Sequence, residues 1–383
     1  MPLRLSLFYA SFFAVVGVQL PYWPAWMAAR GMDAGQIGIL LAITGVARIF
    51  AAPIMGALAD LLGRPKTMIV ILAAGALITN ALYAPARGYW PIFAVTVASS
   101  IFFSTLLPVA DGVTVVVARA REIDYGRVRL WGSIAFIVVS SASGAVIGTG
   151  DDALILWLVL GALALTVGAT LALPDPRHTS RVRLGAWRAL PREFWICGAA
   201  ASLIQASHSV YYGFATLHWR AVGLTDTMIG ALWSEGVIAE IALFAVSVRL
   251  PLGPRAMLLL AATGGILRWA VLGSTDALPA LIAAQLLHAT TFGAAHLALV
   301  RFILREIPPE LSTTAQGMAA AVASTGTAIF LTVAGMLYAG FGARAYFAMA
   351  LLAAIGGAAA FFTRRTPPSP PSPSPASASG NRD

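Results

Sequence analysis

Long apolar runs recur along the whole chain, and they constrain its fold more than any other feature. A helix needs about 20 apolar residues to cross the ~30 Å hydrocarbon core of a bilayer. Twelve runs approach or exceed this length, at approximately 5–29, 36–59, 67–86, 90–118, 130–149, 153–173, 194–219, 228–249, 256–274, 277–303, 314–339 and 345–363. They lack the alternation of strands, so the sequence predicts an all-α polytopic membrane protein with twelve transmembrane helices.

The composition excludes other classes of protein. Hydrophobic residues make up 59% of the chain and charged residues only 11%, whereas a soluble domain carries about a quarter charged residues. A disulfide scaffold is excluded because Cys197 is the single cysteine, which we interpret as a small apolar filler.

The distribution of cations predicts the orientation in the membrane. Most of the 25 Lys and Arg residues lie in the termini and in every second loop, whereas the other loops hold only Arg30, Arg87, Arg220 and Arg344. Cytoplasmic loops carry the excess of positive charge, so both termini are expected in the cytoplasm, as in a bacterial inner-membrane protein. Since topology accounts for the net charge of +9, we expect no nucleic-acid partner.

The chain divides at its longest internal polar segment. We expect an N-terminal six-helix bundle over 1–173, a cytoplasmic linker over 174–193 and a C-terminal six-helix bundle over 194–363. The Pro/Ser-rich segment 364–383 has the composition of a disordered cytoplasmic tail.

The two halves are similar in sequence at an offset of 192 residues. Identical pairs at this offset are Ile37/Ile229, Gly38/Gly230, Leu40/Leu232, Ala47/Ala239 and Ile49/Ile241. Internal repeats of this kind are typical of transporters, whose binding site lies near mid-membrane between the repeats. The same offset places Arg48 opposite Glu240, which predicts two ionisable groups facing each other across a pseudo-twofold axis.

Residues 56–66, Gly-Ala-Leu-Ala-Asp-Leu-Leu-Gly-Arg-Pro-Lys, resemble the loop between the second and third helices of the major facilitator superfamily. Four positions match the family pattern: Gly56, Asp60, Gly63 and Arg64. Leu61 and Pro65 depart from it. Segments 124–133, 208–214 and 232–240 are similar to the 3-phenylpropionate-permease type within that superfamily. The resemblance implies two six-helix bundles related by pseudo-twofold symmetry, alternating access and proton-coupled import.

A first group of candidate residues concerns the conformational change. It comprises Gly56, Asp60, Gly63, Arg64, Asp111, Arg127 and Arg129. We expect Asp60 and Arg64 to act in switching and not in substrate recognition, because they lie at the cytoplasmic rim. For Asp111 two interpretations stay open: a latch for Arg64 or a loop arginine, or a proton site.

A second group concerns the coupled proton, because a charge in mid-membrane costs about 2.5–3.5 kcal/mol and calls for an explanation. Glu240 is interpreted either as the proton-binding carboxylate or as a structural partner of Arg268. Arg268 and His288 belong to the same candidate set, with Glu235 nearer the entrance. The set is similar to that of lactose-permease-type symporters, which carry a carboxylate where this chain has Thr291. His296 is a weaker candidate.

A third group concerns the substrate. Arg48 either anchors a substrate carboxylate or pairs with Asp111 or Glu240. Polar and aromatic residues recur at helical spacing on the first and seventh helices, which line the cavity in the superfamily: Gln19, Trp23, Gln205, His208 and Tyr212. An interfacial aromatic belt is the alternative, and it accounts for Trp26 and Trp219.

These features together predict a secondary active transporter. We expect proton-coupled import of a small organic solute such as an aromatic carboxylate; a sugar or nucleoside importer and a drug or metabolite efflux antiporter are the alternatives. The sequence shows no enzyme, cofactor or metal motif, so a proton gradient is the expected energy source. Protons, a small-molecule substrate and membrane lipid are the expected partners of a monomer.

Overall fold

The computed structural model describes residues 1–148, 150–175, 185–247 and 249–363, all in helices, turns and connections. The predicted tail and part of the predicted linker, residues 176–184, lie outside this part of the chain.

The N-terminal half contains six helices, each at one predicted span. They are α1 (Pro2–Ala29), α2 (Ala34–Leu62), α3 (Pro65–Ala81), α4 (Tyr89–Ala120), α5 (Tyr125–Ile147) and α6 (Ala153–Leu171). Apolar residues on every side of these helices suit a lipid environment, because lipid and neighbouring helices are both apolar.

The C-terminal half follows the same plan with two interruptions. After the short η1 (Ala186–Ala189), the seventh span is divided into α7 (Arg192–Ala206) and α8 (Ser209–Ala221). The eighth and ninth spans are α9 (Asp226–Ser247) and α10 (Pro254–Ser274). The tenth span consists of α11 (Leu278–Leu286), the π-helical turn η2 (Ala289–Ala294) and α12 (Ala295–Glu306). The last two spans are α13 (Ser312–Phe341) and α14 (Ala345–Ala360), with η3 (Pro309–Leu311) and η4 (Gly342–Arg344) beside α13.

Nine helical stretches of the described chain are long and apolar enough to cross a membrane. One of these stretches, Thr314–Ala360, includes both α13 and α14. α3 is apolar but shorter, and the seventh span is divided into α7 and α8, of 15 and 13 residues. The predicted twelve-span, all-α fold is confirmed.

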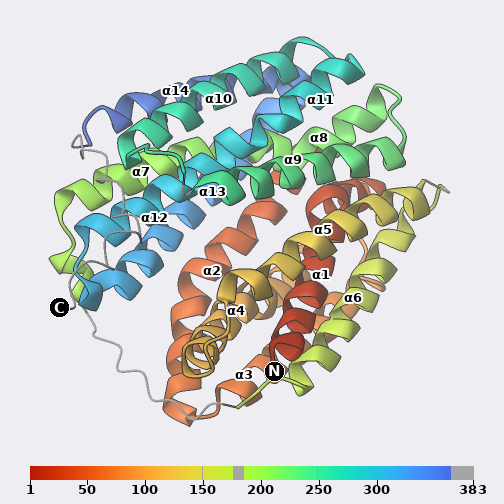
Figure 1. Cartoon of the computed structure of the whole chain (residues 1–383). Helices are drawn as coiled ribbons and strands as arrows, with labels where there is room; N and C mark the ends of the chain where they lie inside the picture. The colour runs from red at the N-terminus through yellow and green to blue at the C-terminus, as the bar shows by residue number, and fades with distance from the viewer. Residues whose placement is uncertain (149, 176–184, 248, 364–383) are drawn as a thin grey trace, which may run out of the picture.

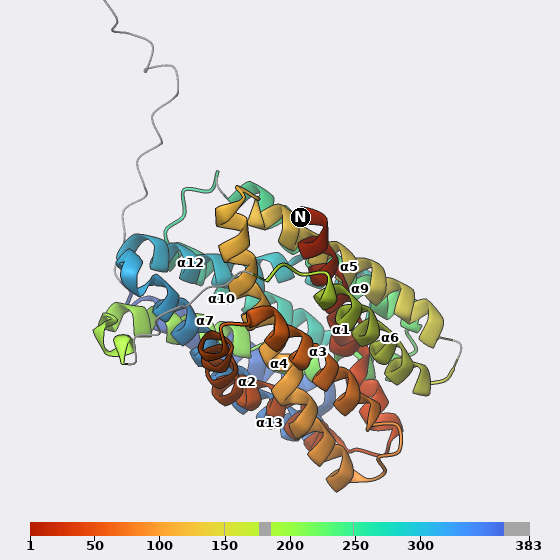
Figure 2. The ribbon, with the colours of Figure 1, turned by 90° about the horizontal axis from the view of Figure 1, so that it is seen from below.

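The two halves meet at one end of the molecule and separate at the other. Figure 1 shows the red-to-yellow and the green-to-blue helices as two groups that spread apart toward the lower left, and Figure 2 shows the same molecule from below. We call the end where α1 begins and α14 ends the termini face, and the end that carries the α1–α2 and α8–α9 connections the far face.

The buried apolar clusters explain this shape. The largest cluster joins both halves and includes Tyr22 and Ile37 from one, and Tyr211 and Trp233 from the other. Toward the termini face each half has its own cluster, one around Phe8 and Leu72 and one around Phe194 and Met257. The halves therefore share a core only toward the far face.

Glycines allow the halves to approach along two helix pairs, α2–α13 and α5–α9. A Cβ at Gly38 would lie 2.7 Å from the carbonyl oxygen of Leu331, and one at Gly335 would lie 2.5 Å from that of Ala34. On the other pair, a Cβ at Gly230 would lie 2.5 Å from the carbonyl oxygen of Ser140. Small residues let helix backbones pack closely, so these positions bring the halves into backbone contact.

Candidate functional site

A buried polar cluster lies inside the C-terminal half, with Arg268 of α10 at its centre. The Arg268 guanidinium donates to Nδ1 of His288 at 2.8 Å, to Oε1 of Gln285 at 2.7 Å and to Oγ1 of Thr291 at 3.3 Å. It lies over the rings of Tyr211 and Trp269, at 4.5 and 4.8 Å from their centroids. The side chain is fully buried, and no described carboxylate pairs with it. Aromatic faces and neutral acceptors therefore compensate its charge.

This bonding sets the tautomer of His288. A guanidinium only donates, so Nδ1 of His288 accepts and its Nε2 carries the hydrogen. That Nε2 lies 3.7 Å from Oε2 of Glu240 on α9. The close approach is possible because Gly236, one turn earlier on α9, leaves room for the imidazole: a Cβ there would lie 3.3 Å from that of His288. Glu240 and Arg268 are thus connected through His288, and the predicted direct pairing of Glu240 with Arg268 is absent.

His208 connects the division of the seventh span to the same cluster. Its Nδ1 lies 3.1 Å from the carbonyl oxygen of Gln205, so that nitrogen donates, and its Nε2 accepts from the hydroxyl of Thr291 at 3.0 Å. Ser207 donates to the carbonyl oxygen of Ile204 at 2.6 Å. Side chains that bond to nearby carbonyls compete with the helical ladder, which accounts for the end of α7 at this point.

A second polar cluster lies in the N-terminal half near the termini face. Asp111 of α4 accepts a short hydrogen bond from the hydroxyl of Tyr9 and another, of 3.2 Å, from that of Tyr125. The Arg129 guanidinium lies 4.0 Å from the ring centroid of Phe13 and 5.4 Å from that of Tyr9. The predicted latch between Asp111 and Arg64 is not formed, and tyrosines hold the carboxylate in place.

Arg129 is also a cation of the N-terminal half with charged or titratable neighbours in the C-terminal half. It lies within electrostatic range of Asp111 in its own half, and of Glu240 and His296 in the other. From the sequence we assign Arg129 to the conformational switch. Its place in the 124–133 segment, which carries the family resemblance, is the signal that could have indicated an electrostatic role between the halves.

Arg48 of α2 does not form the ion pairs that its place in the repeat predicts: neither Asp111 nor Glu240 bonds to it. Its side chain is exposed, and it lies in the middle of α2. Leu41, seven residues earlier and so within about 20° of the same face, packs near Gly213 of α8. Arg48 therefore projects toward the space between the halves. In the described structure α9, which carries Glu240, packs mainly on α5, whereas α2 packs mainly on α13 and α4.

The remaining predicted substrate residues fall into two environments. Trp23 is 7% exposed and stacks on Trp26 at 4.6 Å, so it belongs to the packing of its own half. Gln19 is half-buried and lies 3.5 Å from Asn80. Tyr212 is half-buried and stacks against His208 at 5.5 Å. Gln205 is half-buried beside it.

The predicted switch residues lie at the termini face. Gly63 has a φ of +59°, which favours glycine, and Arg64 is exposed where α3 begins. Arg127 is exposed and lies 3.4 Å from Asp124, which caps α5. Gly56 and Asp60 belong to the last two turns of α2, and Glu235 is half-buried on α9.

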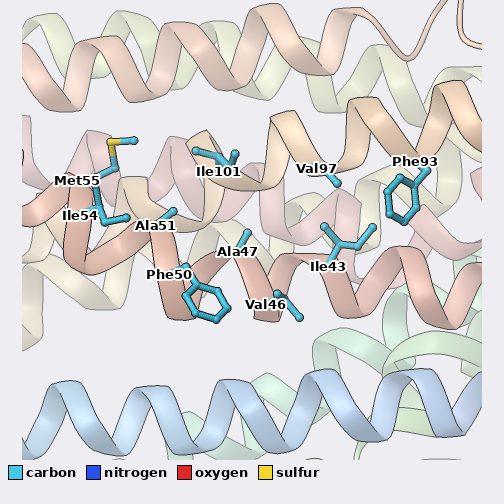
Figure 3. A pocket seen from close by; sticks show the side chains of 10 residues that line it. All are labelled: Ile43, Val46, Ala47, Phe50, Ala51, Ile54, Met55, Phe93, Val97 and Ile101. Carbon is cyan, nitrogen blue, oxygen red and sulfur yellow. The ribbon is translucent and has the colours of Figure 1, made fainter.

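An apolar groove lies on the other side of α2, between α2 and α4 (Figure 3). Its walls include Phe50, Ile54 and Val97, of which Phe50 is 67% exposed. Phe50 follows Arg48 by two residues, or about 200° around the helix, so the groove faces away from the space between the halves. Its apolar lining suits the acyl chains of membrane lipid.

Comparisons with known proteins agree with this architecture. The model of the MFS_1 like family matches residues 2–349. A protein of Escherichia coli described as a probable 3-phenylpropionic acid transporter is 36% identical over 362 residues, which cover 91% of this chain and 94% of that protein. The maltose permease of Geobacillus stearothermophilus is 24% identical, covering 86% of this chain and 85% of that one.

The crystal structure of the nucleoside transporter NupG superposes with a TM-score of 0.80 at 19% identity, covering 94% of this chain and 97% of that one. The family model over residues 2–349 and the relative at 36% identity identify the chain as a transporter of the major facilitator type and not an enzyme, belonging to the MFS_1 like family.

Proposed function

We propose that this protein imports a small aromatic carboxylate together with a proton, driven by the proton gradient. The observation that carries the proposal is the position of Glu240: its Oε2 lies 3.7 Å from Nε2 of His288 in its own half, and its carboxylate lies within electrostatic range of Arg129 in the other half. The Escherichia coli relative described as a probable 3-phenylpropionic acid transporter supports the substrate class.

The arrangement supports coupling between the anion and the proton. With the site empty, the charge of Arg129 favours the ionised form of Glu240. A substrate carboxylate bound to Arg129 would occupy that charge and raise the proton affinity of Glu240. Each ligand would then favour binding of the other, as symport requires. The hydrogen on Nε2 of His288, 3.7 Å from Glu240, offers a donor to the ionised carboxylate.

The aromatic part of the substrate needs an apolar partner. Tyr212 and Phe292 are half-buried aromatic residues, and Phe292 stacks on His288 at 5.5 Å. Rings stack favourably on such faces. If the termini are cytoplasmic, as the arginine distribution predicts, the state described here opens to the cytoplasm. We also propose that the protein works as a monomer and lies in the bacterial inner membrane.

Uptake into proteoliposomes tests the proposal. Proteoliposomes that contain the purified protein should accumulate radiolabelled 3-phenylpropionate when their interior is alkaline. Without this proton gradient they should accumulate far less. Arg129→Gln should weaken substrate binding by about 30-fold, or roughly 2 kcal/mol for a lost charge-assisted pair. Arg121→Gln, an exposed arginine where α4 ends, is the matched control.

Two outcomes would contradict the proposal. Gradient-driven uptake of a nucleoside or a maltose-type sugar, with no uptake of the aromatic acid, would reject the substrate class. Uptake that is indifferent to the gradient would reject proton coupling.

A further inference from the structure

An ion-pair group at the far face connects the two halves at their rim. Arg220, near the end of α8, bonds to Asp226 of its own half through two nitrogens, at 2.7 and 3.0 Å. Its third nitrogen bonds to Asp152 of the N-terminal half at 2.9 Å. One guanidinium fork therefore holds carboxylates from both halves.

The ion pairs lie at the outer end of a longer polar seam along α5 and α9. The carbonyl oxygen of Asp226 accepts from the hydroxyl of Tyr22 at 3.2 Å, across the halves. Further in, Ser234 of α9 bonds to Ser141 at 2.8 Å and to the carbonyl oxygen of Ile137 at 3.0 Å. The seam joins the halves from the rim toward mid-membrane, and its contacts cannot persist if the far face opens.

We propose that Arg220 is the rim lock of the transporter: its bond to Asp152 holds the far face closed and sets the balance between the two access states. Arg220 is anchored to its own half by Asp226, so its bond to Asp152 is the part that must break. The side chains of Arg220 and Asp152 are 24% and 32% exposed, which lets water and ions compete for them. A lock of this kind is strong enough to bias the states and weak enough to release.

The chain offers a matched control at the same face. His218, one turn before the end of α8, lies 2.7 Å from Asp276 in the α10–α11 connection. Both partners belong to the C-terminal half, so this pair stays intact whichever face is open. Replacing Asp276 therefore removes an acidic side chain near the rim without removing a bond between the halves.

Distances between spin labels measure the balance directly and need no substrate or proton gradient. Cysteines replace Trp90 at the start of α4 and Ala277 before α11, both exposed at the far face, in a Cys197→Ser background in nanodiscs. We expect Asp152→Asn to increase the long-distance population by about two- to fivefold, as for loss of one partly exposed pair. Asp152→Glu keeps the carboxylate, so it should show the same distance distribution as the parent protein. Asp276→Asn should also leave that distribution unchanged.

The result has two ways to fail. An unchanged distribution in Asp152→Asn would reject the lock, and so would an equal opening caused by Asp276→Asn. Neither result depends on which solute is carried, so failure of the lock is distinguishable from failure of the proposed symport.

Discussion

Arg268 is a fully buried cation, and no carboxylate of the described residues pairs with it. Its neighbours are the rings of Tyr211 and Trp269 and the acceptor atoms of neutral side chains. An unpaired buried charge is costly, so the residues that accept from it should be hard to replace. The consequence extends to His288, whose free hydrogen is directed at Glu240 because Arg268 occupies the other nitrogen.

The first prediction concerns Glu240→Gln. The amide should imitate the protonated carboxyl group, so the variant should lose accumulation driven by a proton gradient while it keeps exchange of substrate between two loaded compartments. Proteoliposomes measure both activities on the same preparation, and Glu310→Gln, an exposed glutamate between α12 and α13, serves as the control. Continued accumulation against a gradient would move the proton site to His288 or Glu235.

A second prediction separates the two arginines that face the other half. If Arg129 anchors the carboxylate, Arg48→Gln should weaken substrate binding by only a few fold, whereas Arg129→Gln should weaken it about 30-fold. Equilibrium binding of 3-phenylpropionate to the purified variants measures the difference. The opposite order would return the anchor to Arg48, where the internal repeat predicts it.

A third prediction concerns Thr291, whose hydroxyl accepts from Arg268 and donates to His208. Thr291→Val keeps the shape but leaves buried polar atoms without a partner, so it should lower the free energy of unfolding by about 1–3 kcal/mol. Thr291→Ser keeps the hydroxyl and should lie close to the parent. Thermal unfolding in detergent compares the three proteins, and equal destabilisation by both variants would contradict the role of the hydroxyl.

At the scale of helices, the apolar runs predicted position and number well because the bilayer fixes the length of a span. They did not predict the division between α7 and α8 or the π-helical turn after His288. Those features arise where side chains such as Ser207 and His208 bond to backbone carbonyls, and partners such as Thr291 come from distant parts of the chain. Hydropathy carries no information on these contacts.

The close approach of α2 and α13 gives a fourth prediction. Gly38→Ala adds a methyl group that would lie 2.7 Å from the carbonyl oxygen of Leu331, so it should force the far face apart. The Trp90–Ala277 label pair should show a longer distance. Gly168→Ala on α6, where nothing lies within 4 Å, is the control. An unchanged distance in Gly38→Ala would mean that α13 yields instead.

At the scale of the molecule, the sequence predicted two similar halves but not how they meet. The repeat correctly aligned Gly38 with Gly230, and both glycines line contacts between the halves. It does not by itself bring Arg48 and Glu240 together, because α9 packs on α5 and α2 packs on α13 in the described structure. Which residues meet across an axis depends on the tilt of the helices, which no repeat in the sequence records.

The seam between α5 and α9 consists largely of backbone oxygens and small hydroxyl groups, at Ser140, Ser141, Ser234 and Asp226. When such a surface parts, few bulky side chains need a new rotamer, but the hydroxyls of Tyr22, Ser141 and Ser234 need new hydrogen-bond partners. Opening of the far face is therefore a wetting event, and its barrier lies in the arrival of water. Sucrose and similar osmolytes, which disfavour newly hydrated surface, should slow the alternation of this protein even where they leave substrate binding alone.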